Sequence, residues 1–286
     1  MVDWFITAVG AVVVLAILVD IFHTLANPGR QGFLSKLVHT AAWRLTRRSA
    51  WSGPVAMLAV IGIWGLFAVL GWALIYLPHM PEGFSFPSGS PAAQDPAFLD
   101  ALYVSLVTIS TLGFGDVFPA KGWLRVVNPL EAIFGFALLT VAISWVLQVY
   151  PALSRRRALA LRLSLLERAG TRDALPDLEP AVASSILHGL AADIVGARVD
   201  LGDYAETYYF REKRRDSSLP GTLGVAHELG TVATQCPHPD VQLAGRVLLL
   251  AVADLLAVVG ARFLREPHAG PDPMDAYFRD HRHHED

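Results

Sequence analysis

Three long apolar segments stand out in the hydropathy pattern of the chain, at residues 4–25, 55–77 and 130–150. Each is at least as long as the roughly 20 residues that an α-helix needs to cross the hydrocarbon core of a bilayer. Lipid offers no hydrogen-bond partners, so a crossing segment must satisfy its own backbone, as a helix does. The pattern therefore predicts three transmembrane helices.

A fourth apolar segment, residues 97–109, is too short to cross a membrane as a helix. Asp95 and Pro96 precede it, and these residue types favour the N-cap and the first turn of a helix. The segment runs into a glycine-containing stretch and is followed by a full span, an order that suits a re-entrant loop. The turn-rich residues 78–94 predict an exposed loop before it.

Basic residues cluster on one side of the predicted spans. One cluster lies between the first two spans, and a run of three arginines, Arg155 to Arg157, follows the third. Positively charged loops stay in the cytoplasm, so we expect a multi-pass protein of the cell membrane with a cytoplasmic C-terminus and an extracytoplasmic N-terminus. The first cluster consists of Arg30, Lys36, Arg44, Arg47 and Arg48.

The segment that holds this first cluster, residues 30–52, also shows helical periodicity. Apolar residues share one face, and His39 lies with the basic residues on the other face. This amphipathic pattern predicts a helix on the inner membrane surface, with a solvated cytoplasmic loop as the alternative. The apolar face comprises Leu34, Leu37, Val38, Ala41 and Leu45.

The remainder of the chain predicts a mostly helical cytoplasmic domain, with helical periodicity at residues 158–168 and 180–198. Residues 247–261 are apolar, but a helix of that length measures about 22 Å and contains Asp254, which favours a buried soluble helix over a fourth span. No glycine-rich nucleotide-binding motif follows a strand here. The gating stimulus and any cytoplasmic ligand or partner therefore stay unknown.

Composition supports a membrane protein, because the chain is 53% hydrophobic and only 17% charged. Its net charge of −3 gives no indication of nucleic-acid binding. The single cysteine, Cys236, excludes an intrachain disulfide, and we expect neither a cofactor nor an enzymatic activity. The predicted fold is an all-α membrane protein with a first span (1–29), an interfacial helix (30–52), a re-entrant module (53–153) and a cytoplasmic helical domain (154–286).

The stretch Thr111-Leu112-Gly113-Phe114-Gly115 has the residue types that a potassium-coordinating backbone requires. Successive carbonyl groups must face one axis to replace the water shell of the ion, and glycine tolerates the φ/ψ values that this demands. The hydroxyl of Thr111 can add a deeper ring of ligands. Four copies must surround the axis and the chain holds one, so we expect four subunits to assemble.

The pattern T-x-x-T-x-G-F-G-D, from Thr108 to Asp116, resembles the selectivity filter of the potassium channel family. The resemblance extends over residues 55–150. It implies an outer helix, a pore helix, a filter and an inner helix in a homotetramer that conducts K⁺ through a lipid bilayer. It also implies that Tyr103, Thr108 and Asp116 support the filter.

Three positions depart from the commoner pattern of that family. Leu112 replaces valine or isoleucine, and Phe114 replaces tyrosine, although both substitutions occur in the family. Val107 stands where some bacterial members carry a glutamate that pairs with the filter aspartate. Asp116 therefore lacks that partner, and Tyr103 can hydrogen-bond it instead.

The last span has a glycine where inner helices of this family often have one. Gly135 lies 135 − 115 = 20 residues after the last filter glycine, and it acts either as a hinge or as a packing surface. One face of the span is predicted to line the cavity and gate, although the hydroxyls of Thr140 and Ser144 could instead bond carbonyls of their own helix. The predicted lining is Leu139, Thr140, Ile143, Ser144, Leu147 and Gln148.

Two carboxylates, Asp20 and Glu131, fall within or near predicted spans, and an intramembrane carboxylate is a candidate functional group. For Asp20 we favour a structural pair with Arg44, Arg47 or Arg48 over a sensing role. The first span carries no repeated arginines, so a voltage sensor of that kind is not expected.

These observations predict a potassium-selective channel subunit with K⁺ at the filter and no other metal. A nonselective cation channel with the same pore is one alternative, and a membrane-anchored signalling protein with a vestigial pore is another. At the C-terminus, an incomplete set of metal ligands predicts a solvated tail. That set is His281, His283, His284 and Asp286.

Overall fold

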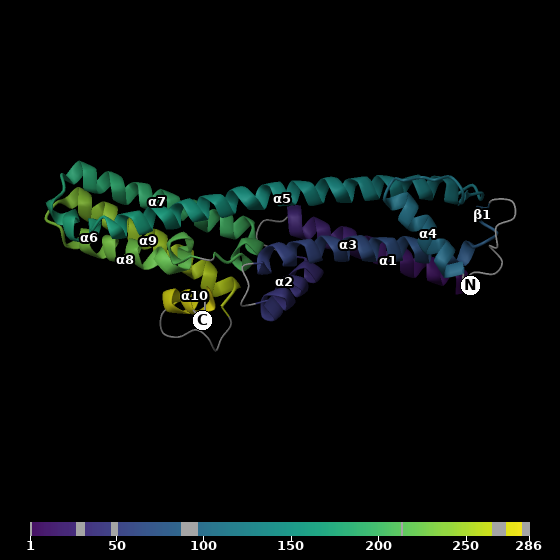
Figure 1. Ribbon diagram of the computed structural model, residues 1–286, viewed down its shortest axis with the longest axis horizontal. Helices are drawn as coiled ribbons and strands as arrows, with labels where there is room; N and C mark the ends of the chain where they lie inside the picture. Colours follow the sequence, from purple (N-terminus) through teal and green to yellow (C-terminus); the bar gives the residue numbers. More distant parts are fainter. Residues whose placement is uncertain are drawn as a thin grey trace. The chain divides into compact units, whose positions relative to one another are not determined.

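The computed structural model describes residues 2–26, 32–46, 51–86, 97–212, 214–264 and 273–281 (Figure 1). The described residues are mostly helical and form two compact units. The first unit comprises Met1–Val38 and Met57–Leu147, and the second unit comprises His39–Ala56 and Gln148–Asp286. The predicted boundary between the re-entrant module and the cytoplasmic domain, after residue 153, lies slightly later along the chain than Leu147, where the first unit ends.

The first unit is built from α1 (Val2–Ala26), most of α3 (Ser52–Tyr76), α4 (Ala97–Ile109) and the N-terminal part of α5 (Leu124–Arg168). The bounds of α4 are those that the sequence predicts. The ends of α1 and α3 agree with the predicted spans to within three residues. The predicted cap of α4, residues 95–96, lies outside the described residues.

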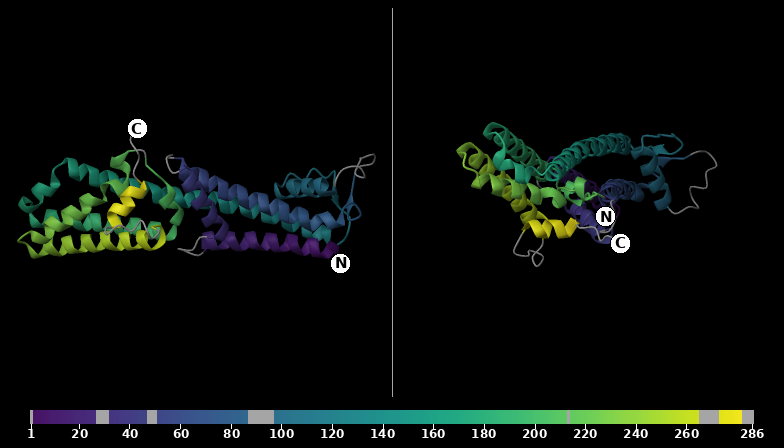
Figure 2. Two further views of the ribbon diagram at one scale, coloured as in Figure 1. Left: turned by 90° about the horizontal axis from the view of Figure 1, so that it is seen from below. Right: turned by 60° about the vertical axis from the view of Figure 1, so that its left-hand side comes forward.

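The helices α1 and α3 lie side by side and approach closely at two glycines (Figure 2). A Cβ atom at Gly10 would lie 2.5 Å from the carbonyl oxygen of Gly71, and a Cβ atom at Gly71 would lie 2.9 Å from the Val14 side chain. Helices in lipid associate through close van der Waals contact, which small residues permit. The first helix is therefore packed tightly against the second apolar helix.

The connection between α3 and α4 starts with regular structure, which corrects the prediction of an exposed loop. The 3-10 helix η1 (Leu77–His79) follows α3, and β1 (Phe84–Ser85) pairs antiparallel with β2 (Phe118–Pro119). Phe84 is buried in the core of the first unit. Residues 87–94 of the predicted loop lie outside the described residues.

One continuous helix of 45 residues, α5, replaces the two helices predicted at 130–150 and 158–168. The predicted interruption is wrong because a change from apolar to basic side chains alters what a helix contacts but does not break its backbone hydrogen bonds. Pro151 lies within the helix, and membrane helices tolerate proline where neighbouring groups satisfy the freed backbone.

The helix α2 (Phe33–Thr46) forms where the sequence predicts an interfacial helix, but its buried side differs from the prediction. His39, predicted on the polar face, is buried and stacks on Tyr209 with 5.3 Å between ring centroids. Leu37, predicted on the apolar face, is exposed. Periodicity identifies the helix, but it cannot show which face an aromatic residue from far along the chain will cover.

The second unit is a bundle in which α9 (Pro239–Arg262) packs against both α7 (Pro180–Asp203) and α8 (Leu219–Gln235). The C-terminal part of α5 and the short α10 (Pro273–His281) complete it, and leucine, alanine and valine fill its core. The periodic run predicted at 180–198 is part of α7. The smaller elements are α6 (Thr171–Ala174), η2 (Leu175–Asp177), η3 (Ala205–Tyr209) and η4 (Arg215–Ser217).

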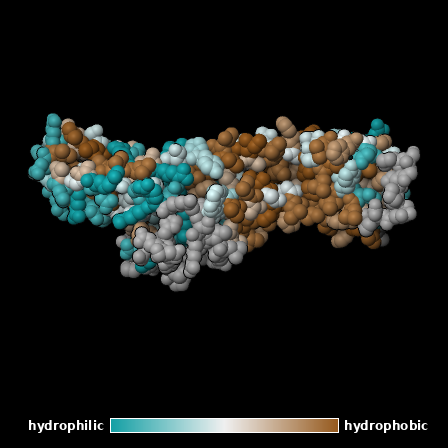
Figure 3. Space-filling view, viewed as in Figure 1, coloured by the Kyte–Doolittle hydropathy of each residue, from teal (hydrophilic) through white to brown (hydrophobic). Residues whose placement is uncertain are grey.

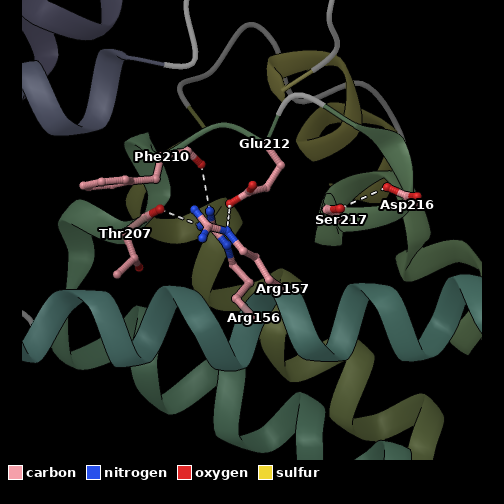
Figure 4. A network of polar contacts seen from close by, with 7 residues as sticks. All are labelled: Arg156, Arg157, Thr207, Phe210, Glu212, Asp216 and Ser217. Atoms are coloured by element: carbon pink, nitrogen blue, oxygen red, sulfur yellow. Dashed lines mark hydrogen bonds and ion pairs between the residues drawn. The ribbon is translucent and has the colours of Figure 1, made fainter.

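A buried arginine of α5 binds the segment after α7, which includes η3 (Figure 4). The guanidinium of Arg156 donates to the carbonyl oxygens of Thr207 at 2.5 Å and Phe210 at 2.8 Å. The neighbouring Arg157 pairs with Glu212 at 2.6 Å and is far more exposed. The basic run that follows the third predicted span therefore has one buried member, Arg156, that binds backbone carbonyls.

Five described helices are long and apolar enough to cross a membrane, judged by length and composition. Three of them, α1, α3 and α5, contain the predicted spans, and α7 and α9 are additional candidates. The helix α9 is longer than residues 247–261, so its length does not exclude a crossing. Both additional helices also contribute to the core of the second unit.

Candidate functional site

The backbone after α4 is tied back to the last turn of that helix. The amide of Thr111 donates to the carbonyl of Thr108 at 2.9 Å, and the amides of Leu112 and Gly113 donate to the carbonyl of Val107 at 3.0 and 3.3 Å. These bonds occupy carbonyls that a helix C-terminus would otherwise leave free. The stretch from Thr111 to Gly115 therefore starts from a defined position.

The same stretch has left-handed backbone at every second residue. The φ angles are +58° at Thr111, +57° at Gly113 and +76° at Gly115, whereas Leu112 and Phe114 lack positive φ. In an ordinary strand, successive peptide groups point in opposite directions. A left-handed residue at alternate positions reverses every second peptide, so successive carbonyls can face one side, as ion coordination requires.

Thr111 is the non-glycine residue with positive φ among the described residues. A β-branched side chain is especially unfavourable there, because its Cβ substituents crowd the backbone. Strain of this kind persists only where surrounding contacts impose it, and it is concentrated at functional sites. The position of Thr111, at the start of the alternating stretch, marks this segment as a candidate site.

Tyr103 on α4 supports the end of the stretch. Its hydroxyl donates to Oδ2 of Asp116 at 2.6 Å, and the amide of Val117 donates to Oδ1 at 2.9 Å. The hydrogen bond from Tyr103 lowers the pKa of Asp116 below its ordinary value. The bond between Tyr103 and Asp116 that the sequence suggests is thus present.

A buried polar network connects α3, α4 and α5 beside this stretch. Oε2 of Glu131 accepts from the Tyr76 hydroxyl, and Oε1 accepts from the Ser105 hydroxyl, both at 2.6 Å. Nδ2 of Asn128 donates to Oγ1 of Thr108 at 2.9 Å. The sequence marks Glu131 and Thr108 as candidate functional residues, but it does not predict their partners on neighbouring helices.

Gly135 lies against the end of α4. A Cβ atom at this position would collide with the carbonyl oxygen of Ile109 and would lie 2.8 Å from its side chain. Since α5 runs through Gly135 without interruption, the structure favours the packing interpretation of this glycine over the hinge.

The predicted cavity lining forms an exposed stripe on α5. All its members are exposed in the single chain, whereas Ala142, Trp145 and Val149 on the opposite face are buried. The hydroxyl of Thr140 donates to the carbonyl of Phe136 at 2.9 Å, which is the alternative that the sequence left open. The stripe consists of Leu139, Thr140, Ile143, Ser144, Leu147 and Gln148.

Asp20 has neutral partners. Its carboxylate accepts from the Leu34 amide at 2.9 Å, from the Ser35 hydroxyl at 2.9 Å and from Nε1 of Trp64 at 2.9 Å. Both oxygens are therefore used within the first unit. Arg47 and Arg48, two of its expected partners, lie outside the described residues.

Among the described residues, no group of three or more histidine, cysteine, aspartate or glutamate side chains could hold a metal ion. His281, predicted in a solvated tail, is instead buried at the end of α10, with Nε2 2.9 Å from the carbonyl oxygen of Tyr208. The remaining tail ligands, residues 283–286, lie outside the described residues.

Comparisons with known proteins identify an ion-channel domain in this part of the chain. A family model described as an ion channel matches residues 61–150. Two-pore potassium channel 5 of Arabidopsis thaliana is 38% identical over 48 residues, which cover 17% of this chain and 12% of that protein. The uncharacterized membrane protein YdjJ of Bacillus subtilis is 28% identical over 120 residues, which cover 42% of this chain and 34% of that protein.

The chain thus spans only a minor part of those two relatives, and no solved structure matches it. Protein LctB of Bacillus caldotenax is 30% identical over 109 residues, which cover 37% of this chain and 81% of that protein. With an ion-channel domain at residues 61–150 and several helices that could span a membrane, the chain is a multi-pass membrane protein that belongs to the same family as protein LctB.

Proposed function

We propose that the chain is one subunit of a homotetrameric, potassium-selective channel. The alternation of left-handed residues at Thr111, Gly113 and Gly115 carries this proposal, because it is the backbone pattern with which carbonyls can replace the water shell of K⁺. The similarity of 48 residues to a two-pore potassium channel supports the same ion.

The position of α4 adds an electrostatic contribution. The helix ends at Ile109, and the C-terminal end of a helix carries partial negative charge. A cation that approaches the stretch from the side of Thr111 is stabilised by this charge. Neither a carboxylate nor another charged group is then needed among residues 111–115.

Assembly of four chains follows from the number of ligands. One chain provides one set of carbonyls, and a potassium filter requires four sets around an axis. Residues 111–116 and the stripe on α5 are exposed in the single chain, so they are available to ions, water and neighbouring subunits. The apolar side chains Ile133 and Phe136 on α5 are also exposed and suit contacts with lipid or with another subunit.

Reconstitution tests the proposed selectivity. Purified protein in liposomes should pass K⁺ along its gradient and pass little Na⁺ under an equal gradient, with empty liposomes as the blank. Equal fluxes of the two ions would show a nonselective channel, and no flux of either ion would favour the vestigial pore.

The proposed topology places Glu82 outside the cell and His188 in the cytoplasm, because basic loops stay inside. Both side chains are exposed in the structure. Single cysteines at these positions, introduced with Cys236→Ser, should react with a membrane-impermeant maleimide from opposite sides of the membrane. Labelling of both from one side would refute this topology.

A further inference from the structure

Glu131 is a fully buried acid that joins three helices of the first unit. Its exposed fraction is 0%, and its two oxygens accept hydrogen bonds from two other helices, through Tyr76 of α3 and Ser105 of α4. A buried carboxylate is costly, and membrane proteins retain such groups mainly where they serve a function. A purely structural contact among three helices could be made by apolar side chains alone.

The polar contacts continue from Glu131 into the filter stretch. Tyr76 Oη lies 3.4 Å from Nδ2 of Asn128, and Asn128 donates to Oγ1 of Thr108 at 2.9 Å. The carbonyl of Thr108 in turn accepts from the amide of Thr111 at 2.9 Å. An unbroken chain of contacts therefore links the carboxylate to the residue whose backbone is strained.

One face of α5 sets the register between α4 and α5. Asn128, Glu131 and Gly135 are spaced as i, i+3 and i+7, so they lie along one side of the helix. Gly135 allows α5 to approach the carbonyl of Ile109, while the other two residues form directional hydrogen bonds. Apolar contacts tolerate small sliding movements, but a network of directional bonds in a low-dielectric setting does not.

We propose that Glu131 is a positioning residue for the selectivity filter, acting through Tyr76, Ser105, Asn128 and Thr108 on the backbone at Thr111. The proposal rests on the proposed function, since it assigns to Glu131 the geometry on which potassium selectivity depends. Glu131 does not touch the ion. It keeps α4 at the height and rotation at which the left-handed conformation of Thr111 is held.

Asp20 provides a matched control for Glu131. It is also a buried carboxylate of the first unit, 5% exposed, with hydrogen bonds to a serine hydroxyl and an aromatic side chain. Its hydrogen-bond partners are Leu34 and Ser35 of α2 and Trp64 of α3, whereas those of Glu131 include Ser105 of α4. Replacing Asp20 by asparagine therefore tests the general effect of exchanging a buried acid for an amide without disturbing the filter support.

The experiment compares Glu131→Gln, Tyr76→Phe and Thr108→Val with two control variants in liposomes. The controls are Asp20→Asn and Tyr150→Phe, which removes a tyrosine hydroxyl at an exposed position of α5. Tetramer yield, the fraction of conducting channels and the ratio of K⁺ to Na⁺ permeability are measured for each. We expect Glu131→Gln and Tyr76→Phe to lower the permeability ratio or the conducting fraction about tenfold, the factor that the loss of one buried hydrogen bond makes in an equilibrium. The control variants should keep the unmodified ratio.

A double-mutant cycle tests the route of the effect. If Tyr76 and Thr108 act through one network, the combined variant Tyr76→Phe/Thr108→Val should lose less than the product of the two single losses. Independent losses would show that the network does not transmit the effect of Glu131, and the proposal would be abandoned.

Assembled Glu131→Gln channels with the unmodified ratio and conducting fraction would also overturn the proposal. If Glu131→Gln does not assemble, Tyr76→Phe decides, since it retains the carboxylate and the ring and removes one hydrogen bond. Comparable K⁺ and Na⁺ fluxes in the unmodified protein would instead refute the proposed selectivity. The positioning role would then be judged on the conducting fraction alone.

Discussion

The first unit exposes apolar side chains, whereas the second unit carries ion pairs on its surface, a difference that Figure 3 shows in its brown and teal areas. Phe5, Leu58 and Phe136 are all more than 60% exposed in the first unit. Among the residues of the second unit that the structure describes there are six ion pairs, one of them between Arg155 and Asp200 at 2.6 Å. The first surface suits lipid and the second suits water.

Buried charges differ between the units in the same way. In the first unit, Asp20 and Glu131 accept hydrogen bonds from neutral donors. In the second unit, Arg156 is buried and donates to backbone carbonyls. The comparison therefore predicts that changes at the filter and its support in the first unit affect ion conduction, while changes in the second unit affect its stability and leave ion selectivity unchanged.

The largest effect is expected at the filter glycines. Gly113→Ala puts a Cβ atom on a residue with φ of +57°, at a cost of about 1–3 kcal/mol in each subunit. Four subunits share one axis, so K⁺ flux in liposomes should be lost. Gly122→Ala is the control, because Gly122 has open space around it and no positive φ. Normal flux through Gly113→Ala channels would contradict the claim that K⁺ conduction depends on the left-handed backbone at Gly113.

Gly135→Ala should have the next largest effect. The added methyl group would meet the carbonyl of Ile109, and overpacking of this kind costs about 1–3 kcal/mol. We expect a lower thermal stability of the tetramer in detergent. Gly62→Ala, where a Cβ atom meets nothing within 4 Å, should leave stability unchanged or raise it. If Gly135→Ala kept full stability and altered only channel opening, the hinge would be the better interpretation.

Arg156→Met tests the second unit. The substitution leaves the carbonyls of Thr207 and Phe210 without their donor, which should lower the free energy of unfolding by about 2 kcal/mol. Arg157→Met removes a partly exposed pair and should cost less than about 1 kcal/mol. Urea unfolding measures both changes, and the K⁺ to Na⁺ ratio should not move. A changed ratio in Arg156→Met would contradict the division between the two units.

Much of the first unit could be predicted from the sequence because its signals are local. The helix at Ala97–Ile109 is marked by turn-forming residues before it and glycines after it. Tyr103 and Asp116 lie close to each other in the chain, so their hydrogen bond could also be predicted. Apolar length alone located α1 and α3.

The contacts between distant segments could not be predicted from a single sequence. The partners of Glu131 depend on how α3, α4 and α5 are rotated about their axes, and hydropathy does not define that rotation. For the same reason the predicted polar face of α2 includes His39, which the structure buries against Tyr209. The collision that a side chain would cause at Gly135 depends on the position of Ile109, 26 residues earlier in the chain (135 − 109 = 26).

The smallest expected effect concerns an ion pair between α7 and α9, and it tests whether these two helices lie in water or in lipid. Arg198 on α7 and Asp254 on α9 lie 2.9 Å apart, with side chains 41% and 60% exposed. In water, the pair contributes at most about 1 kcal/mol, because both charges are hydrated when they separate. In lipid, an unpaired aspartate would cost about 2.5–3.5 kcal/mol.

Arg198→Met therefore separates the two environments, although both helices have the length and composition of a membrane span. We expect the free energy of unfolding of the second unit to fall by less than about 1 kcal/mol. Arg172→Met is the control, because its ion pair with Glu228, at 3.1 Å, is also exposed and lies on α6 and α8, outside the candidate spans. Equal small losses in the two variants would place α7 and α9 in water. If the free energy of unfolding fell several times more in Arg198→Met than in Arg172→Met, α7 and α9 would lie in lipid. The second unit would then contain both lipid-facing and water-facing surfaces, and the contrast between the two units would no longer hold.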